Sequence, residues 1–247
     1  MRDSIQNRRA RIRFAALVIG AITLVVIALY VENLRDVLEA RSLLKDIAAL
    51  RVNQTTDDQI SQLVKRYRGK ETGVSSGDCS LGERTYWVSI NDKVLNALGP
   101  NMGRFRLFGN RVWFVDARFS TSEGHLCRAE YRLFAWIRGI DLMELSVLEL
   151  QPRDHSQGES YSVYGHVQRN IYYLRTEARD PTPEERRRAF DFRLDCLARF
   201  GGCGNPCEIA PAAWTDAEKE AKSEGVPFPP PGFDVGCTLP TDFQAAH

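Results

Sequence analysis

The feature that most constrains this chain is an uncharged apolar run from Phe14 to Val31. A helix of about eighteen residues is roughly 27 Å long at a rise of about 1.5 Å per residue, and this is close to the roughly 30 Å thickness of a hydrocarbon core. We therefore predict a transmembrane anchor over residues 14–31, which follows a basic tail of residues 1–13 and precedes about two hundred further residues.

The charges on the two sides of this run predict its orientation. The tail carries five arginines and Asp3, a net of +4, whereas the five charged residues of 32–41 sum to −1. Because arginine beside a span resists translocation, we expect a cytoplasmic N-terminus and an extracytoplasmic C-terminal domain, at a bacterial inner membrane facing the periplasm. A cleaved secretory signal is the alternative, but Ala28–Val31 is a poor cleavage site and the run is longer than a usual signal core.

Six cysteines all follow the apolar run, and none precedes it. An even number of cysteines on the exported side is typical of a disulfide-stapled domain. Nearness in sequence suggests Cys79 with Cys127, with the other four cysteines pairing among themselves. The alternative is a zinc site, for which a single Cys-x3-Cys step without a second pair is weak support. The candidates for disulfides are Cys79, Cys127, Cys196, Cys203, Cys207 and Cys237.

Composition argues against several classes of function. The chain has 33 basic and 32 acidic residues, and removing the tail (five basic, one acidic) leaves 28 against 31, a net of −3 for the remainder. Such a balance lacks the basic footprint of a nucleic-acid binder. There is no glycine-rich phosphate loop and no closely spaced histidine pair, so we expect neither a cofactor nor a bound metal.

Local patterns predict an α+β domain over residues 51–180. Thr56–Gln59 matches a capping box, which predicts a helix over Asp57–Tyr67 that ends at Arg68-Gly69. Alternation then predicts a mostly antiparallel sheet with the helices packed on one face, and a Gly109-Asn110 turn between its second and third strands. The expected strands cover residues 85–90, 104–108, 111–119, 129–138, 141–150, 159–168 and 171–176, with a short helix after Asn91.

The segment between the anchor and this domain, residues 32–50, reads as a juxtamembrane helix that could continue directly from the span. Its apolar residues recur at three- and four-residue steps. This stripe could pack on the domain below, or it could form a coiled-coil dimer, although less than three heptads fall within the segment. The stripe consists of Leu34, Val37, Leu38, Leu44 and Ile47.

Residues 181–247 form a cysteine-rich C-terminal segment that we expect to pack on the domain. Thr182-Pro183-Glu184-Glu185 is a good helix start. The alternation from Phe190 to Cys196 suggests that this helical turn leads into a strand. We further expect a loop over 73–78, a helix over 215–224 and extended chain over 226–232.

The order of these elements resembles uncharacterised single-pass membrane proteins of Acidobacteria. The resemblance is carried by the basic head, the span, Thr56–Gly69, the Cys79 loop, Tyr86–Leu98 and Phe190–Trp214. That family has no assigned activity, so the resemblance implies a membrane location but no catalytic residue. The chain also shows a weaker likeness to small outer-membrane assembly lipoproteins, but it lacks their lipobox cysteine.

The function we expect is that of an interaction or scaffold module, whose partner is another envelope protein and whose small-molecule ligand is unknown. Exposed rings on one face of the sheet could bind a peptide or a sugar, and the candidates are Trp87, Trp113, Tyr131 and Trp136. The alternative is an exported hydrolase, for which Asp154, His155 and His166 could meet in space. No motif identifies a catalytic residue.

Overall fold

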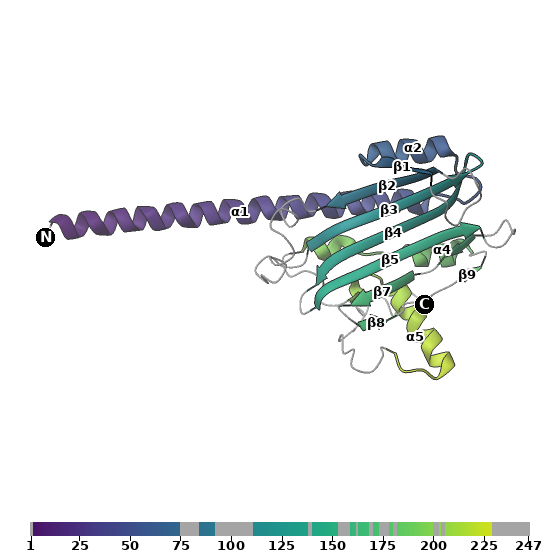
Figure 1. Cartoon of the computed structure of the whole chain (residues 1–247). Helices are drawn as coiled ribbons and strands as arrows, with labels where there is room; N and C mark the ends of the chain where they lie inside the picture. The colour runs from purple at the N-terminus through teal and green to yellow at the C-terminus, as the bar shows by residue number, and fades with distance from the viewer. Residues whose placement is uncertain are drawn as a thin grey trace.

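The computed structural model has the α+β arrangement that the sequence predicts, with a mostly antiparallel sheet and a long N-terminal helix (Figure 1). Every pairing between the described strands is antiparallel. The structure describes residues 2–74, 84–91, 111–137, 140–152, 159–161, 163–167, 170–172, 178–179, 182–199, 203 and 206–228.

Helix α1 (Arg2–Ala48) is a single uninterrupted helix of 47 residues. Its first part projects away from the rest of the molecule, and its last part lies behind the sheet (Figure 1). The expected anchor and the expected juxtamembrane helix are therefore one rigid element, because no break in the helix separates Val31 from Glu32.

Helix α2 (Asp57–Arg66) begins at the predicted capping box. The Thr56 hydroxyl accepts a hydrogen bond from the Gln59 backbone, and the Gln59 side chain accepts one from the Thr56 backbone. After the helix the chain passes very close to the sheet at Gly69, where an added Cβ would lie 2.5 Å from the Trp87 carbonyl oxygen. Glycine is needed there because any side chain would collide with backbone.

The sheet runs in the order β1-β2-β3-β4-β5-β6-β9, with β7 on the β5 edge and β8 on β7. Two predictions are corrected: β1 extends into the expected 73–78 loop, and the expected strand over 159–168 is two strands, β6 and β7. The helix after Asn91, the 104–108 strand and its turn lie outside the described residues. The strands are β1 (Lys70–Val74), β2 (Arg84–Asn91), β3 (Arg111–Ser122), β4 (His125–Ile137), β5 (Ile140–Pro152), β6 (Glu159–Tyr161), β7 (Val163–Val167), β8 (Asn170–Tyr172) and β9 (Ala178–Arg179).

The core lies between α1, α2 and one face of the sheet, which we call the inner face. Alternate residues of β2, β3 and β4 point into it, and Val88, Phe119 and Tyr131 are fully or almost fully buried. The Tyr131 hydroxyl donates to the Ala40 carbonyl of α1 at 3.4 Å, and burial raises the pKa of this phenol. Tyr131 therefore fixes β4 against the middle of the packed half of α1.

A polar cluster around Asp57 joins α2 to the sheet. Its carboxylate accepts hydrogen bonds from the Tyr86 hydroxyl at 2.8 Å and the Thr121 hydroxyl at 2.5 Å, and it pairs with Arg84 at 3.1 Å. Burial raises the pKa of this carboxyl, but the hydrogen bonds from Thr121 and Tyr86 and the charge of Arg84 outweigh burial, so the pKa lies below its usual value.

This lowered pKa predicts a loss of stability in acid. A carboxyl with a depressed folded-state pKa contributes stability above its unfolded value of about 3.9, and this contribution disappears as the pH falls through the folded value. We expect the free energy of unfolding of Asp57→Asn to fall below that of the wild type at neutral pH and to converge with it as the pH falls through the lowered pKa of Asp57. Urea unfolding at several pH values measures this, with the exposed neighbour Asp58→Asn as control; a gap that does not close in acid would contradict it.

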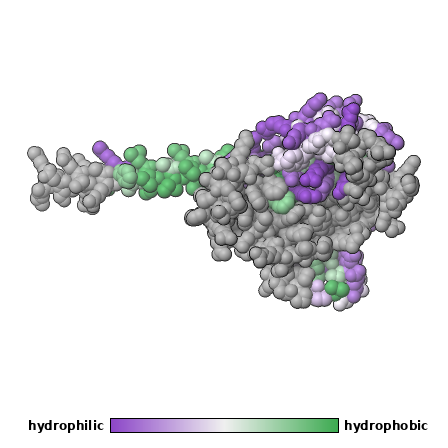
Figure 2. Space-filling view, in the orientation of Figure 1, coloured by the Kyte–Doolittle hydropathy of each residue, from purple (hydrophilic) through white to green (hydrophobic). Residues whose placement is uncertain are grey.

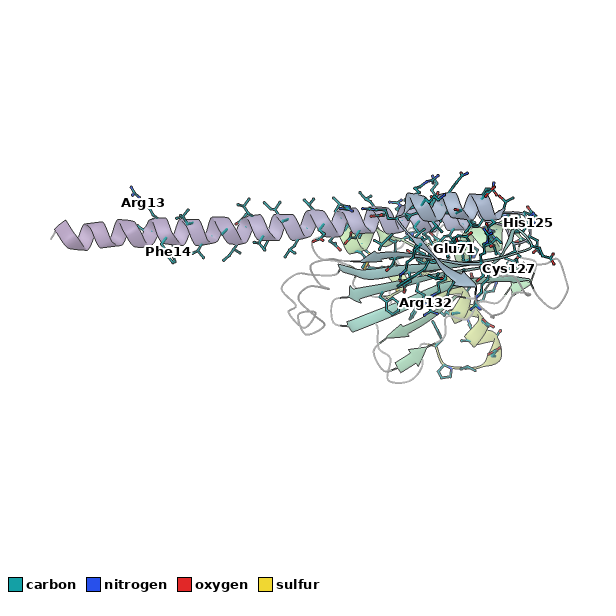
Figure 3. All side chains as sticks on the ribbon, turned by 45° about the horizontal axis from the view of Figure 1, so that its top comes forward. Arg13, Phe14, Glu71, His125, Cys127 and Arg132 are labelled. Atoms are coloured by element: carbon teal, nitrogen blue, oxygen red, sulfur yellow. A yellow bond between two sulfur atoms is a disulfide. The ribbon has the colours of Figure 1, made fainter. Side chains whose placement is uncertain are left out.

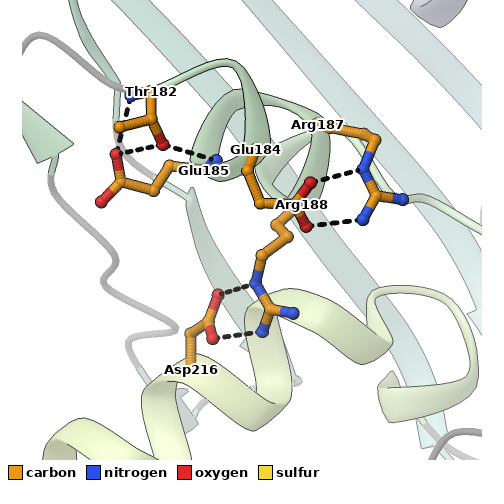
Figure 4. A network of polar contacts seen from close by, with 6 residues as sticks. All are labelled: Thr182, Glu184, Glu185, Arg187, Arg188 and Asp216. Atoms are coloured by element: carbon orange, nitrogen blue, oxygen red, sulfur yellow. Dashed lines mark hydrogen bonds and ion pairs between the residues drawn. The ribbon is translucent and has the colours of Figure 1, made fainter. Parts of the chain in front are cut away.

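The C-terminal segment packs on the domain through two helices and two short 3₁₀ turns. Helix α4 (Pro183–Ala189) starts where the sequence predicts a helix, and Thr182 and Glu185 form a capping box there. Arg188 forms an ion pair with Asp216 of helix α5 (Pro211–Glu224) (Figure 4). Helix α5 begins four residues before the predicted start, at Pro211.

The strand predicted after α4 is wrong, because this stretch instead ends in the 3₁₀ helix η3 (Leu194–Ala198). The buried residues include Leu197 beside Cys196, a pattern that alternation would not produce. A second turn, η4 (Pro206–Glu208), leads into α5.

Arg186 of α4 binds the C-terminal end of α1. Its guanidinium donates to the Leu50 carbonyl at 2.5 Å and to the Ala48 carbonyl at 3.2 Å, and the side chain is buried with 6% of the residue exposed. Arg51 donates to the same two carbonyl oxygens. Two cations at a helix C-terminus satisfy carbonyls that lack partners within the helix, and they complement its dipole. We call Arg186, Arg51 and the two carbonyls the arginine clamp.

The clamp predicts an unequal effect of two adjacent substitutions. Arg186→Met keeps the apolar stem but removes the buried one of the two guanidinium groups that donate to these carbonyls, so we expect a loss of about 1.5–3 kcal/mol in the free energy of unfolding. Arg187→Met removes only an exposed pair with Glu184 and should cost less than about 0.5 kcal/mol. Urea unfolding of the full chain in detergent compares them; equal losses would show that the clamp does not hold α1.

Candidate functional site

The projecting half of α1 presents apolar side chains to its surroundings on all sides. Phe14 and Leu17 are 70% and 73% exposed, whereas Val37 and Leu43 further along the same helix are 2% and 0% exposed. Figure 2 shows this part of α1 as a hydrophobic rod, and Figure 3 shows Arg13 and Phe14 at its beginning. A helix that is hydrophobic all round needs an apolar environment, and the folded domain does not supply one here.

Within the described residues, α1 is the one helix long and apolar enough to cross a membrane. Its most apolar stretch reaches a mean hydropathy of 2.7, and none of that stretch is buried in the protein. The absence of burial distinguishes it from the core helix of a globular protein.

The change from exposed to buried surface along α1 takes place within one turn. Val31 is 57% exposed, and Asn33, two residues later, is 5% exposed and donates from Nδ2 to the Leu197 carbonyl at 2.9 Å. Arg41 then pairs with Asp195 of η3 at 2.6 Å. Because contact with the domain begins directly after the apolar run, no flexible linker separates the two.

The second candidate surface is the face of the sheet that points away from α1. We call it the outer face, and it is the face turned toward the viewer in Figures 1 and 2, where hydrophilic residues gather over the upper strands. The register aligns Lys70, Trp87, Arg118 and Glu130 across four strands, and Asp116 lies opposite Arg132 in the row beside them. The outer face is defined here by Lys70, Trp87, Asp116, Arg118, Glu130 and Arg132.

Trp87 lies at the centre of the polar contacts on this face. The Lys70 ammonium sits 5.0 Å from the Trp87 ring centroid, and Trp87 Nε1 donates to Asp116 at 3.2 Å. A cation–π contact and an indole hydrogen bond together fix the ring. Arg132 donates to the Glu130 carboxylate, so that pair is internally neutral.

The remaining charge on the outer face is positive. Lys70, Arg118 and Arg132 contribute +3 and Asp116 and Glu130 contribute −2, which leaves +1. Arg118 is exposed and makes no ion pair or hydrogen bond within the described part of the chain. Lys70 has no carboxylate partner there either, so both cations can bind a carboxylate from outside.

The predicted aromatic binding face is only partly correct. Tyr131 has no exposed surface and belongs to the core, so it cannot share a surface with Trp87. The reason is alternation combined with register: Tyr131 pairs with Ala117 on the inner face, whereas Trp87 pairs with Arg118 on the outer face. The side chains of Trp113 and Trp136 lie outside the described part of the structure.

Lys70, Asp116, Arg118, Glu130 and Arg132 were not among the predicted site residues. Alternation within β3 and β4 separates these charged positions from the apolar ones, but only the register between strands shows that they meet. Lys70 carried no signal, because no strand was predicted from the sequence over the residues of β1.

The candidates for catalysis and metal binding find no support in the described residues. No group of three or more histidine, cysteine, aspartate or glutamate side chains among them could hold a metal ion. Asp154 and His155 lie outside the description, and His166 pairs in register with Glu144 and Ile171.

The cysteines form disulfides rather than a zinc site where the structure describes them. Cys196 and Cys203 form a disulfide with an S–S distance of 2.05 Å. Cys127 and Cys207 each take part in a disulfide as well. The zinc alternative requires Cys196, Cys203, Cys207 and Cys237 as ligands. The first three are disulfide-bonded and are therefore unavailable to a metal ion. Cys79 and Cys237, and with them the expected Cys79–Cys127 pair, lie outside the described residues.

No family model matches this chain, and neither the curated proteins nor the solved structures contain a match to it.

Proposed function

We propose that this chain is a membrane-anchored interaction or scaffold module of the bacterial envelope, with a cytoplasmic N-terminus and its domain in the periplasm. The observation that carries the proposal is the continuity of α1, whose exposed apolar half passes without a break into a half that is buried in the domain. Such a helix would join a bilayer to a folded domain without a flexible linker between them.

The orientation is supported by the charges beside the span. The tail before Phe14 carries a net charge of +4, and the segment directly after Val31 is slightly negative. The disulfide between Cys196 and Cys203 agrees with an oxidising compartment. The same location is implied by the resemblance to acidobacterial single-pass proteins.

Fusion reporters test the orientation. A phosphatase that is active only after export should be active when fused after His247, and a fluorescent protein that folds only in the cytoplasm should stay dark there. Changing Arg8, Arg9, Arg11 and Arg13 to glutamine should reduce export of the domain, because the retention signal is lost. Arg35→Gln, beyond the span, is the control and should change nothing.

Membrane extraction and mass measurement of the same protein show whether the apolar helix is retained as an anchor or cleaved as a signal. Alkaline washing of membranes should leave the full-length chain in the pellet, and its mass should include the N-terminal tail. A mature chain lacking residues 1–31 would contradict the anchor and favour a cleaved signal.

We propose that the outer face binds an acidic segment of another envelope protein. The exposed Arg118 and Lys70 supply cationic hydrogen-bond donors, and the fixed Trp87 ring supplies adjacent apolar contact area. Arginine and tryptophan are the residues most often found at the energetic centre of protein interfaces. A carboxylate between Arg118 and Lys70 would neutralise the excess charge of this face.

Site-specific crosslinking tests the binding face even though the partner is unidentified. A photoreactive residue at position 118 should capture a discrete envelope protein, and the same residue at Lys65, on the exposed surface of α2, should not. With the captured protein purified, Trp87→Ala and Arg118→Glu should each weaken binding about tenfold or more. Lys65→Glu is the charge-matched control, and an equal loss from that substitution would contradict the proposed site.

A further inference from the structure

The packed half of α1 leaves two of its predicted stripe residues outside the domain. Val37, Leu44 and Ile47 are buried, but Leu38 is 56% exposed and Leu34 is only partly buried. At about 100° of rotation per residue, Leu38 lies roughly 160° around the helix from Ala40, whose exposure is zero. Leu38 therefore faces away from the domain, on the side of α1 that the domain leaves open.

Leu38 continues a seven-residue spacing that begins inside the apolar half. Leu17, Leu24, Val31 and Leu38 recur at every seventh position, with exposed fractions of 73%, 68%, 57% and 56%. A second set follows three residues after each of the first three members: Gly20, Ile27 and Leu34. These are the a and d positions of a heptad pattern, and we call them the α1 seam. The seam covers three heptads, about 33 Å of helix.

The heptad spacing is informative about helix pairing only beyond Val31, where the apolar run ends. Within the apolar run any spacing would meet apolar residues, but beyond Val31 the exposed surface of α1 is otherwise polar, with Arg35, Ser42 and Lys45 on it. The seam also has charged ends in register. Arg13 precedes it and Arg41 follows it at d positions, Lys45 follows Leu38 at the next a position, and Arg41 is held by Asp195.

We propose that the α1 seam pairs with the seam of a second copy of this chain, so that the protein is a parallel homodimer in the membrane. This proposal rests on the insertion of α1 proposed above, because copies inserted with one orientation have parallel helices with their seams at the same height. The described part of the domain packs on the opposite side of α1, at Asn33, Asp36, Ala40 and Leu43, and leaves the seam open.

Both parts of the seam have a physical reason to associate. In the bilayer, Gly20 has no side chain and no other part of the chain packs against it, so a partner helix can approach closely there. Outside the bilayer, pairing removes Leu38 and Leu34 from water, which is favourable in proportion to the apolar area buried. The two contributions act on the same face of one helix.

Cysteine crosslinking of the full chain in native membranes tests the seam. Leu24→Cys and Leu38→Cys place thiols on it, and Val26→Cys places one on the opposite side of the same helix. Under a mild oxidant, disulfide-linked dimers should form at positions 24 and 38 at least about fivefold more than at position 26. Equal yields at all three positions would overturn the seam.

The engineered thiols could exchange with the disulfides of the domain, so a second measurement that uses no added cysteine is needed. Light scattering of the full chain in detergent should show a dimer, and Leu38→Glu should weaken its association about tenfold or more while the circular dichroism of the domain is unchanged. Val226→Glu, which places the same charge at an exposed apolar position outside α1, is the control and should remain dimeric. A monomeric wild type would overturn the dimer and leave the anchor standing, whereas a chain that washes off membranes would refute the anchor itself.

Discussion

The whole structure depends on one helix that serves two environments. Residues 14–31 of α1 are apolar on every side, and the stretch that follows is buried on one side only, against the inner face of the sheet. Its backbone hydrogen bonds are satisfied internally over the whole length, as a membrane crossing requires. Because the helix is unbroken between Val31 and Asn33, any rotation or tilt of its apolar part is passed directly to the domain. In the membrane insertion that we propose, this continuity would hold the domain at the surface of the bilayer.

The C-terminal segment explains how the packed half of α1 is held in place. Helix α4 supplies Arg186 to the end of α1, η3 supplies the Leu197 carbonyl to Asn33, and Asp195 pairs with Arg41. These contacts lie along the length of the packed half, and they come from residues more than a hundred positions away in sequence. A buried arginine is tolerated because its donors meet carbonyls that the helix terminus leaves without partners. The segment is thus part of the domain's structure and not an appended tail.

The sequence predicted the features that depend on neighbouring residues. The capping box at Thr56, the helix start at Thr182, the apolar run and the alternation of β2 to β5 are local signals, and the structure contains all of them. The errors arise where distant parts of the chain decide the outcome. The alternation from Phe190 to Cys196 imitates a strand, but the residues pack as a 3₁₀ turn. Likewise, only the register shows that Tyr131 belongs to the core and that Lys70, Trp87 and Arg118 lie together.

The same geometry connects the two proposed surfaces. The seam lies on the side of α1 that the described part of the domain leaves exposed. The outer face lies on the side of the sheet opposite α1 (Figure 1). When two copies pair through their seams, the order across the assembly is outer face, sheet, helix, helix, sheet, outer face. Pairing therefore covers neither Trp87 nor Arg118, and it turns the two outer faces in opposite directions about the common axis. A dimer of this form presents two separate binding faces at one fixed height above the membrane, which is the arrangement that a scaffold between two partner molecules requires.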